Sequence, residues 1–396
     1  MVIQRAVGAA LLCAVLAMSG CASSGTSDSS GDADDFVLYA SMALTGPIAG
    51  PVGAQAAGLK AGVSAVNKDG GIDGRQIRLV LNDDGGDPGR ATTLLQEQLD
   101  KGPIDLAIPG SISNVALAAV PILTREKILS TGFHAALQDA AKYPYEFNFS
   151  PPMPTQTQGL VDEIVARGFK KVALLHANDA TGNLVADSYE RQLAGAGLSL
   201  TTEGYALADV DMTAQLQALQ AKNPDVFIFQ GFGPLAGYIL KDRTKLGWDI
   251  PTYGNTEVGS IDLTAVSSPA DWKNFQVLAM YSGSAAVPRT AGYTQMTDAL
   301  KEAGVTINQA LPQYAAFWDI PHFVKRVWES ADSKNPDALV KAWLQLDEKA
   351  TPDSPFVFMS RLRFSPESHS IDISPEEAVR ILTPGPLVDG QMQGRP

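Results

Sequence analysis

Residues 67–88 read NKDGGIDGRQIRLVLNDDGGDP, and this stretch holds most of the signals that decide the fold. Its opening residues, 67–71, predict the end of a helix followed by a glycine turn. The apolar run at 76–82 predicts a strand, and an acidic turn follows it. Asp87 and Pro88 are typical of a helix start, because Asp caps free backbone N–H groups and Pro fits the first helical position. The stretch therefore predicts a helix, a strand and a second helix in succession.

The same alternation continues along the chain from residue 36. The strand candidates are continuous apolar runs, which are typical of sheets that are buried on both faces. Strand–helix alternation of this kind predicts an α/β fold with central parallel sheets and helices on both faces. Strands are expected at 36–41, 76–82, 104–108, 128–131, 145–149, 171–176, 225–230, 251–254 and 275–281. Helices are expected near 53–68, 88–101, 113–126, 155–168, 183–196, 211–222, 234–247, 291–303, 312–331 and 336–347.

The alternating pattern breaks in three places, and these breaks suggest domain boundaries. The strongest break is the proline-rich segment 150–154, and weaker breaks lie at 282–284 and 352–355. Three crossings of the chain divide the body into two lobes. The expected lobes are 36–152 plus 284–354 for the first and 153–283 plus 355–396 for the second.

The N-terminus predicts export. Residues 1–20 have one early basic residue and then an apolar run, which is typical of a signal peptide and too short to span a membrane as a helix. The segment Met18-Ser19-Gly20-Cys21 resembles a bacterial lipobox, so Cys21 is expected to become the lipidated N-terminus. Ordinary signal cleavage is the alternative. Residues 21–35 are small, polar and acidic, and they predict a flexible tether on the outer face of the cell membrane.

The composition is that of a globular protein, with 45% hydrophobic and 18% charged residues. The formal net charge of −13 argues against a nucleic-acid partner, because such a partner requires a basic surface. The chain has two cysteines, and Cys13 lies in the expected signal peptide. If Cys21 carries lipid, no thiol is left for a disulfide, a cysteine-based zinc site or a nucleophile.

Motifs for catalysis or cofactor binding are missing from the sequence. No glycine-rich dinucleotide or phosphate loop follows a strand, and there is no nucleophile elbow. The four histidines are not at metal-ligand spacing, and the acidic turn at 83–87 lacks the spacing of a calcium loop. We therefore expect no enzyme activity, no cofactor and no metal. A hydrolase with a catalytic triad assembled in space is the alternative, because triads do not follow sequence order.

Four segments together resemble one known family. They are 43–47 (ALTGP), 67–84, 110–113 (GSIS) and 313–317 (QYAAF). In this order they resemble the type I periplasmic solute-binding proteins of the leucine/isoleucine/valine-binding family, over about 36–365. The resemblance implies two Rossmann-like lobes, three crossovers and a ligand cleft between the lobes. It also implies a monomeric receptor that passes a small solute, a branched-chain or other hydrophobic amino acid, to the permease of an ABC importer.

Strand ends predict where the ligand binds. In open α/β sheets, ligands lie beyond the carboxyl ends of the strands. The loops at those ends are 43–53, 110–114, 131–135, 178–183, 231–233 and 255–259. Ser111, Ser113 and Asn114 open a helix there, and hydroxyls and backbone N–H groups at a helix start suit a carboxylate. A plain N-cap is the alternative role of Ser113.

The resemblance implies further contacts in the loop 131–135. Gly132, Phe133 and Ala135 fall where the family uses backbone groups to hold the carboxylate and amine of the ligand. His134 lies between them, and it is either a ligand contact or a histidine with a structural role at the surface.

The resemblance also implies which side chains line the cleft. The pocket aromatics of the family fall on Val52, Thr181 and Phe232, so only Phe232 keeps a ring. The family's acidic residue that holds the ammonium group falls on Glu257, and its retention favours an amino acid. The loss of two rings favours a different side chain, or a ligand that is an aromatic or aliphatic carboxylate or an amide. A ligand-sensing module of a signalling system is a further alternative, since it would share the fold.

Overall fold

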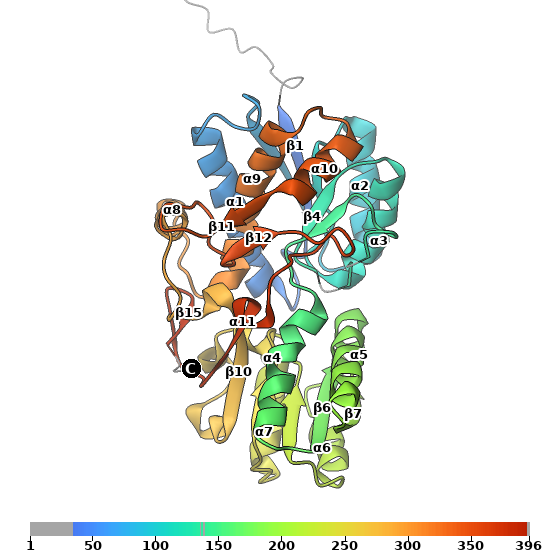
Figure 1. The fold of residues 1–396 in the computed structure, drawn as a ribbon, viewed down its shortest axis with the longest axis vertical. Helices are drawn as coiled ribbons and strands as arrows, with labels where there is room; N and C mark the ends of the chain where they lie inside the picture. Colours follow the sequence, from blue (N-terminus) through green and yellow to red (C-terminus); the bar gives the residue numbers. More distant parts are fainter. Residues whose placement is uncertain (1–34, 135, 138, 394–396) are drawn as a thin grey trace, which may run out of the picture. The chain divides into compact units, whose positions relative to one another are not determined.

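This computed structural model describes residues 35–134, 136–137 and 139–393. The expected signal peptide, Cys21, almost all of the tether, and Ala135 lie outside these residues. The ribbon in Figure 1 follows the chain from blue to red.

The first lobe is built on a five-stranded sheet with the order β2-β1-β3-β4-β5. Its paired neighbours are all parallel. The strands are β1 (Phe36–Met42), β2 (Ile77–Asp83), β3 (Leu106–Ile108), β4 (Ser130–Gly132) and β5 (Glu146–Asn148). The helices of this lobe are α1 (Ala49–Lys68), α2 (Pro88–Lys101), α3 (Ser113–Arg125), α8 (Ala291–Glu302), α9 (Leu311–Ser330) and α10 (Pro336–Gln345).

The second lobe is built on a six-stranded sheet with the order β13-β10-β9-β8-β6-β7, in which only the edge strand β13 is antiparallel to its neighbour. The strands are β6 (Lys171–Ala177), β7 (Ser199–Tyr205), β8 (Val226–Phe229), β9 (Thr252–Gly254), β10 (Phe275–Met280) and β13 (Val379–Leu382). The helices are α4 (Met153–Ala166), α5 (Ala180–Gly195), α6 (Thr213–Gln220), α7 (Pro234–Lys245) and α11 (Pro375–Ala378), with 3₁₀ turns η1 (Val258–Ser260), η2 (Leu263–Ala265), η3 (Pro269–Trp272) and η4 (Tyr281–Gly283).

Two small antiparallel pairs complete the fold: β11 (Asp347–Lys349) with β12 (Arg361–Arg363), and β14 (Leu387–Val388) with β15 (Gln391–Met392). The expected α/β fold with two lobes and central parallel sheets is confirmed. Among the described residues, no helix combines the length and apolar character that crossing a membrane requires.

Close packing of α1 on α9 fixes the core of the first lobe. The two helices lie side by side in Figure 1, although they are far apart in the sequence. A Cβ atom on Gly58 of α1 would lie 2.2 Å from the backbone oxygen of Tyr314 in α9, so only glycine allows this approach. Trp318 follows one turn later in α9 and is fully buried. The two helices therefore contribute much of the core of the first lobe.

The C-terminal part of the chain differs from the expected boundary at residue 354. Phe356, Phe358 and Met359 are buried in the core of the first lobe, and Figure 1 shows β11 and β12 beside α9. The buried Asp319 of α9 accepts hydrogen bonds from the backbone N–H groups of Val357 and Phe358 at 2.9 Å. The proline-rich segment 352–355 is therefore a turn within the first lobe. The chain enters the second lobe later, between β12 and β13.

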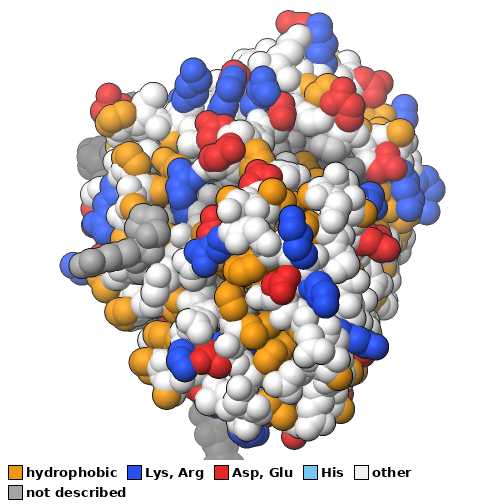
Figure 2. All heavy atoms as spheres, turned by 60° about the horizontal axis from the view of Figure 1, so that its bottom comes forward, with side chains coloured by type: hydrophobic (Ala, Val, Ile, Leu, Met, Phe, Trp, Pro, Cys, Tyr) orange, Lys and Arg blue, Asp and Glu red, His pale blue; other side chains and the backbone are white. Residues whose placement is uncertain are grey.

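The surface shown in Figure 2 carries basic and acidic side chains that are intermixed. The excess of acidic residues is therefore not gathered into one block on this face.

Candidate ligand-binding site

Two of the expected site residues, one from each lobe, form a hydrogen bond. Ser113 is the first residue of α3 in the first lobe, and Thr181 lies in the first turn of α5 in the second lobe. The Thr181 hydroxyl donates to the Ser113 hydroxyl at 3.3 Å. Ser113 is not an N-cap, because Ile112 occupies that position without a side-chain bond. The Ser113 hydroxyl is therefore not used for capping, and it bonds Thr181 where the two lobes meet.

Ser111 ties together two loops of the first lobe. Its buried hydroxyl accepts a hydrogen bond from the backbone N–H of Ala43 at 3.0 Å, which joins the loop after β3 to the loop after β1. Asn114 is exposed at the start of α3, whereas Val52, in the first turn of α1, is buried in the hydrophobic core. Of these three expected residues, Ser111 therefore contributes to the shape of the site by holding its loops.

The acidic turn after β2 braces the same region. The Asp83 carboxylate accepts hydrogen bonds from the backbone N–H groups of Leu44, Thr45 and Gly85 at 2.9–3.2 Å. The Thr45 hydroxyl also donates to it, and these bonds hold the pKa of Asp83 below its usual range, with the Thr45 hydroxyl as the main cause. The carboxylate thus holds the loop after β1 in place.

The loop after β4 contains a buried histidine, His134. Gly132 ends β4, and a Cβ atom there would lie 2.3 Å from Nε2 of His134. The His134 ring is fully buried, with Nε2 3.4 Å from Oε1 of Glu146, so it is a buried group and not a surface residue. The backbone N–H of His134 donates to Oδ1 of Asn148 at 3.1 Å. Phe133 is half-buried and packs edge-on against Phe358, with ring centroids 5.4 Å apart.

Glu257 lies in the second lobe, in the loop that follows β9. Its Oε2 accepts a hydrogen bond from Nε2 of Gln230 at 2.6 Å. Part of the side chain remains accessible, yet loss of water raises the pKa of Glu257 to about 7, and the negative charge of Asp179 adds to this rise. Within the described residues, the groups that act on Glu257 are Gln230, Asn255 and Asp179, and none of them is a cation.

Tyr205 and Asp179 lie near Glu257, and these three residues with Gln230 form a negatively charged corner of the second lobe. The Tyr205 hydroxyl donates to the backbone oxygen of Gln230 at 3.0 Å, and burial, with Glu257 and Asp179 nearby, raises its pKa. Asp179 caps α5, because its Oδ1 accepts from the backbone N–H of Gly182 at 2.7 Å. Two carboxylates therefore lie in one corner of the second lobe, and a cationic group would relieve their repulsion.

A polar chain connects the Glu257 loop to the first crossing between the lobes. The Thr256 hydroxyl donates to Oε1 of Gln156 at 2.7 Å, and Nε2 of Gln156 donates to the backbone oxygen of Pro151 at 2.7 Å. Phe232, the remaining ring, is half-buried at the edge of the second core, in the loop before α7. Sequence reasoning did not single out Gln230, Asp179 or Gln156, although Gln230 ends an expected strand and Asp179 lies in one of the expected loops.

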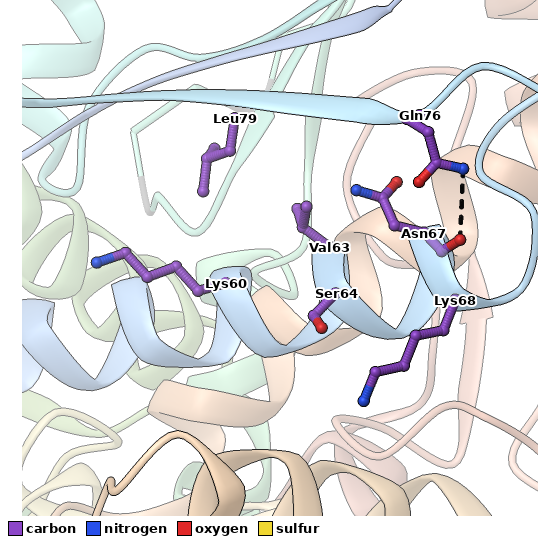
Figure 3. Close-up of a pocket in the computed structure, with 7 residues that line it drawn as sticks. All are labelled: Lys60, Val63, Ser64, Asn67, Lys68, Gln76 and Leu79. Carbon is purple, nitrogen blue, oxygen red and sulfur yellow. Dashed lines mark hydrogen bonds between the residues drawn. The ribbon is translucent and has the colours of Figure 1, made fainter. Parts of the chain in front are cut away.

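A surface pocket on α1 and β2 lies elsewhere. It is lined by Lys60, Val63, Ser64, Asn67, Lys68, Gln76 and Leu79, which Figure 3 shows along α1 and the amino end of β2. The Asn67 side chain is already hydrogen-bonded there. Its Oδ1 accepts from the N–H of Ile77 at 2.7 Å, and its Nδ2 donates to the oxygen of Ile77 at 3.0 Å. The pocket is at the opposite end of the strand from the loops described above, so we do not assign the ligand to it.

A model of the periplasmic binding protein family matches residues 41–370, which cover most of the described chain and all of the loops above. The chain belongs to this family. Its members are solute-binding proteins that work outside the cytoplasm, and the two-lobed fold is the type I fold of the family.

Known proteins similar to this chain bind different solutes. A leucine-, isoleucine-, valine-, threonine- and alanine-binding protein of Pseudomonas aeruginosa is 25% identical over 75% of this chain and 81% of its own length. The branched-chain amino acid transporter protein LivJ of Streptococcus pneumoniae, solved with isoleucine, has a TM-score of 0.71 at 18% identity, covering 91% of this chain and 98% of its own. A solute-binding protein of Rhodopseudomonas palustris, solved with 3,4-dihydroxybenzoic acid, has a TM-score of 0.72 at 22% identity, covering 91% and 95%.

Proposed function

We propose that this protein is a receptor that binds a branched-chain or other hydrophobic amino acid between its lobes and delivers it to an ABC permease. The observation that carries the proposal is the corner around Glu257. This carboxyl group is desolvated, lies near a second carboxylate and is held by a neutral amide, and none of the described groups that act on it is a cation. An ammonium group of a ligand would supply the missing counter-charge through charge-assisted hydrogen bonds.

The other end of the ligand is assigned to the first lobe. Ser113 opens α3, and the helix N-terminus together with its hydroxyl suits a carboxylate. Because Thr181 of the second lobe reaches Ser113, a zwitterionic ligand could contact both lobes at once. Gly132, Phe133 and Ala135 are proposed to add backbone contacts, and Phe232 and Thr181 are proposed to face the ligand side chain.

The cellular setting belongs to the same proposal. We assign residues 1–20 to a signal peptide, Cys21 to a lipid anchor and residues 21–35 to a tether that leads to a monomeric body. This arrangement would keep the receptor beside its permease in the cell membrane. The support is the sequence pattern alone, and mass spectrometry of the N-terminal peptide from membrane-extracted protein tests it.

An aromatic carboxylate is the second candidate ligand. It is favoured by the loss of rings at Val52 and Thr181, which changes the family's pocket, and a similar protein was solved with a dihydroxybenzoic acid. The carboxylates of Glu257 and Asp179 argue against it, because they would repel a benzoate that carries no cationic group.

Thermal stability with added ligands tests the proposal. Purified protein is screened against the standard amino acids and against hydroxybenzoates, because a ligand at a hundred times its Kd adds about 2.7 kcal/mol of stability. An amino acid hit is then titrated into Glu257→Gln, which should lose about two to four decades of affinity because the ammonium loses its partner. Binding of hydroxybenzoates alone, with no amino acid, would overturn the amino acid assignment.

A further inference from the structure

The Gln230 side chain is held on both sides of its amide. Gln230 directly follows β8 and is 4% exposed. Its Oε1 accepts a hydrogen bond from the backbone N–H of Ala177 at 2.7 Å, and its Nε2 donates to Oε2 of Glu257 at 2.6 Å. The backbone of Gln230 is bonded as well. Its N–H donates to the backbone oxygen of Leu175 at 2.9 Å, and its oxygen accepts from the Tyr205 hydroxyl at 3.0 Å.

The backbone of β6 determines which way this amide points. The N–H of Ala177 can only donate, so the amide oxygen of Gln230 must face it. The NH₂ group then faces Glu257, where a carboxylate can only accept. A flipped amide would lose both bonds. Its NH₂ group would face the N–H of Ala177, and its oxygen would face the Glu257 carboxylate. The orientation is therefore set by the main chain and does not depend on a ligand.

We propose that Gln230 is a positioning residue for ligand recognition, whose amide fixes the Glu257 carboxylate in place and favours its ionised form before the ligand arrives. The inference rests on the proposed function, in which Glu257 receives the ammonium group. It assigns a role to a residue that does not itself touch the ligand.

The surroundings of Glu257 make this donor necessary. Desolvation and the charge of Asp179 both raise the pKa of Glu257, whereas the hydrogen bonds of Gln230 and Asn255 lower it. The Tyr205 hydroxyl, a further titratable group close to Glu257, donates its proton to the backbone oxygen of Gln230. Gln230 and Asn255 are thus the two groups whose hydrogen bonds favour the ionised form of Glu257 in spite of burial, and Gln230 has the larger effect.

The experiment follows the titration of Glu257 in ligand-free protein, by NMR of its side-chain carboxyl carbon, assigned with Glu257→Gln. Gln230→Met keeps the length of the side chain and removes both polar groups. Gln230→Leu also removes both polar groups and adds no charge beside Glu257. Gln313→Met, which removes a buried amide bonded to Gln55 in the first lobe, is the matched control.

The midpoint of the Glu257 titration should rise by about one unit or more in both Gln230 variants, because hydrogen bonds to charged groups are strong, and it should stay unchanged in Gln313→Met. Amino acid affinity should then fall most at acidic pH and recover partly at alkaline pH. An unchanged midpoint, or an equal loss of affinity at every pH, would overturn the proposal. If Gln230→Met fails to fold, Gln230→Leu decides the question. If wild-type protein binds no amino acid, the proposed function fails, and the ligand-free midpoints still show whether Gln230 holds the carboxylate.

Discussion

The hydroxyl of Thr181 donates to the hydroxyl of Ser113 at 3.3 Å, and this bond joins the first turns of two helices that belong to different sheets. Helix α3 follows β3 in the first lobe, and α5 follows β6 in the second. A ligand that uses the Ser113 hydroxyl therefore binds next to a contact that itself holds the lobes together.

Thr181→Val is expected to weaken ligand binding by about two- to tenfold, because one neutral hydrogen bond contributes about 0.5–1.5 kcal/mol. The substitution keeps the shape of the side chain and removes the donor. Calorimetric titration of wild type and variant measures the change. Thr264→Val is the control, because its hydroxyl bonds the nearby Asp262 at an exposed turn of the same lobe. Equal affinities of wild type and Thr181→Val would show that the bond does not contribute to ligand binding.

Amino acid affinity should increase as the pH rises from about 5.5 to 7 and then level off. The ligand ammonium needs ionised Glu257, and the pKa of that carboxyl is about 7. Below this value each pH unit costs up to about tenfold in affinity. Calorimetry at pH 6 in buffers of different ionisation enthalpy should also detect release of a proton on binding. A flat profile between pH 5.5 and 8 would contradict the assignment.

The raised pKa of Glu257 also makes the stability of the ligand-free protein depend on pH, and this stability falls as the pH rises. The folded-state pKa of Glu257 is raised above the ordinary value of 4.5, so its contribution to stability is complete below that value and is lost as the pH rises through about 7. Glu257→Gln has no charge to bury. We therefore expect the ligand-free variant to melt at a higher temperature than wild type at pH 8 and not at pH 4.5, measured by calorimetric scanning. A lower melting temperature at pH 8 would contradict the burial of this charge.

Local signals in the sequence predicted the elements that have strong local chemistry. Asp87 caps α2 as expected, since its Oδ1 accepts from the backbone N–H of Arg90 at 2.7 Å. Strand β7 was missed because its sequence, SLTTEGY, has no apolar run, and as an edge strand it pairs only with β6. The boundary at 354 was misplaced because a proline-rich turn resembles a crossing, and only the packing of Phe356 and Phe358 separates the two.

From the sequence, a residue could be proposed for the site only where its own position or its family resemblance pointed to it. The position of Ser113 beyond a strand end and the family resemblance of Thr181 and Glu257 singled out these three residues, and the structure joins Ser113 and Thr181 by a hydrogen bond. Gln230 could not be found in this way, because its role depends on β8 lying beside β6, which places Ala177 next to it. Strand order is a property of the assembled sheet and is not written in local sequence.

Asp319→Asn should destabilise the first lobe. The buried carboxylate accepts two bonds from Val357 and one from Phe358, at 2.9–3.1 Å. An amide would turn a donor towards one of these N–H groups, which costs about 1–3 kcal/mol for a buried unsatisfied group. Urea denaturation should show the loss as a lower midpoint. Asp332→Asn, on an exposed residue just after α9, should leave the midpoint unchanged. Equal midpoints for Asp319→Asn and wild type would mean that segment 356–359 does not depend on this carboxylate.

Gly132→Ala should damage both stability and binding, because the new methyl group would lie 2.3 Å from Nε2 of the buried His134 ring. Overpacking of this kind costs about 1–3 kcal/mol, and the loop after β4 would have to move. Gly53→Ala is the matched control, since a Cβ atom there meets nothing within 4 Å and helix α1 gains a better helix former. The double variant Gly132→Ala with His134→Ala removes the clash, so it should regain stability relative to the sum of the two single changes, measured by denaturation. Strict additivity of the two changes would show that the methyl group and the ring do not meet.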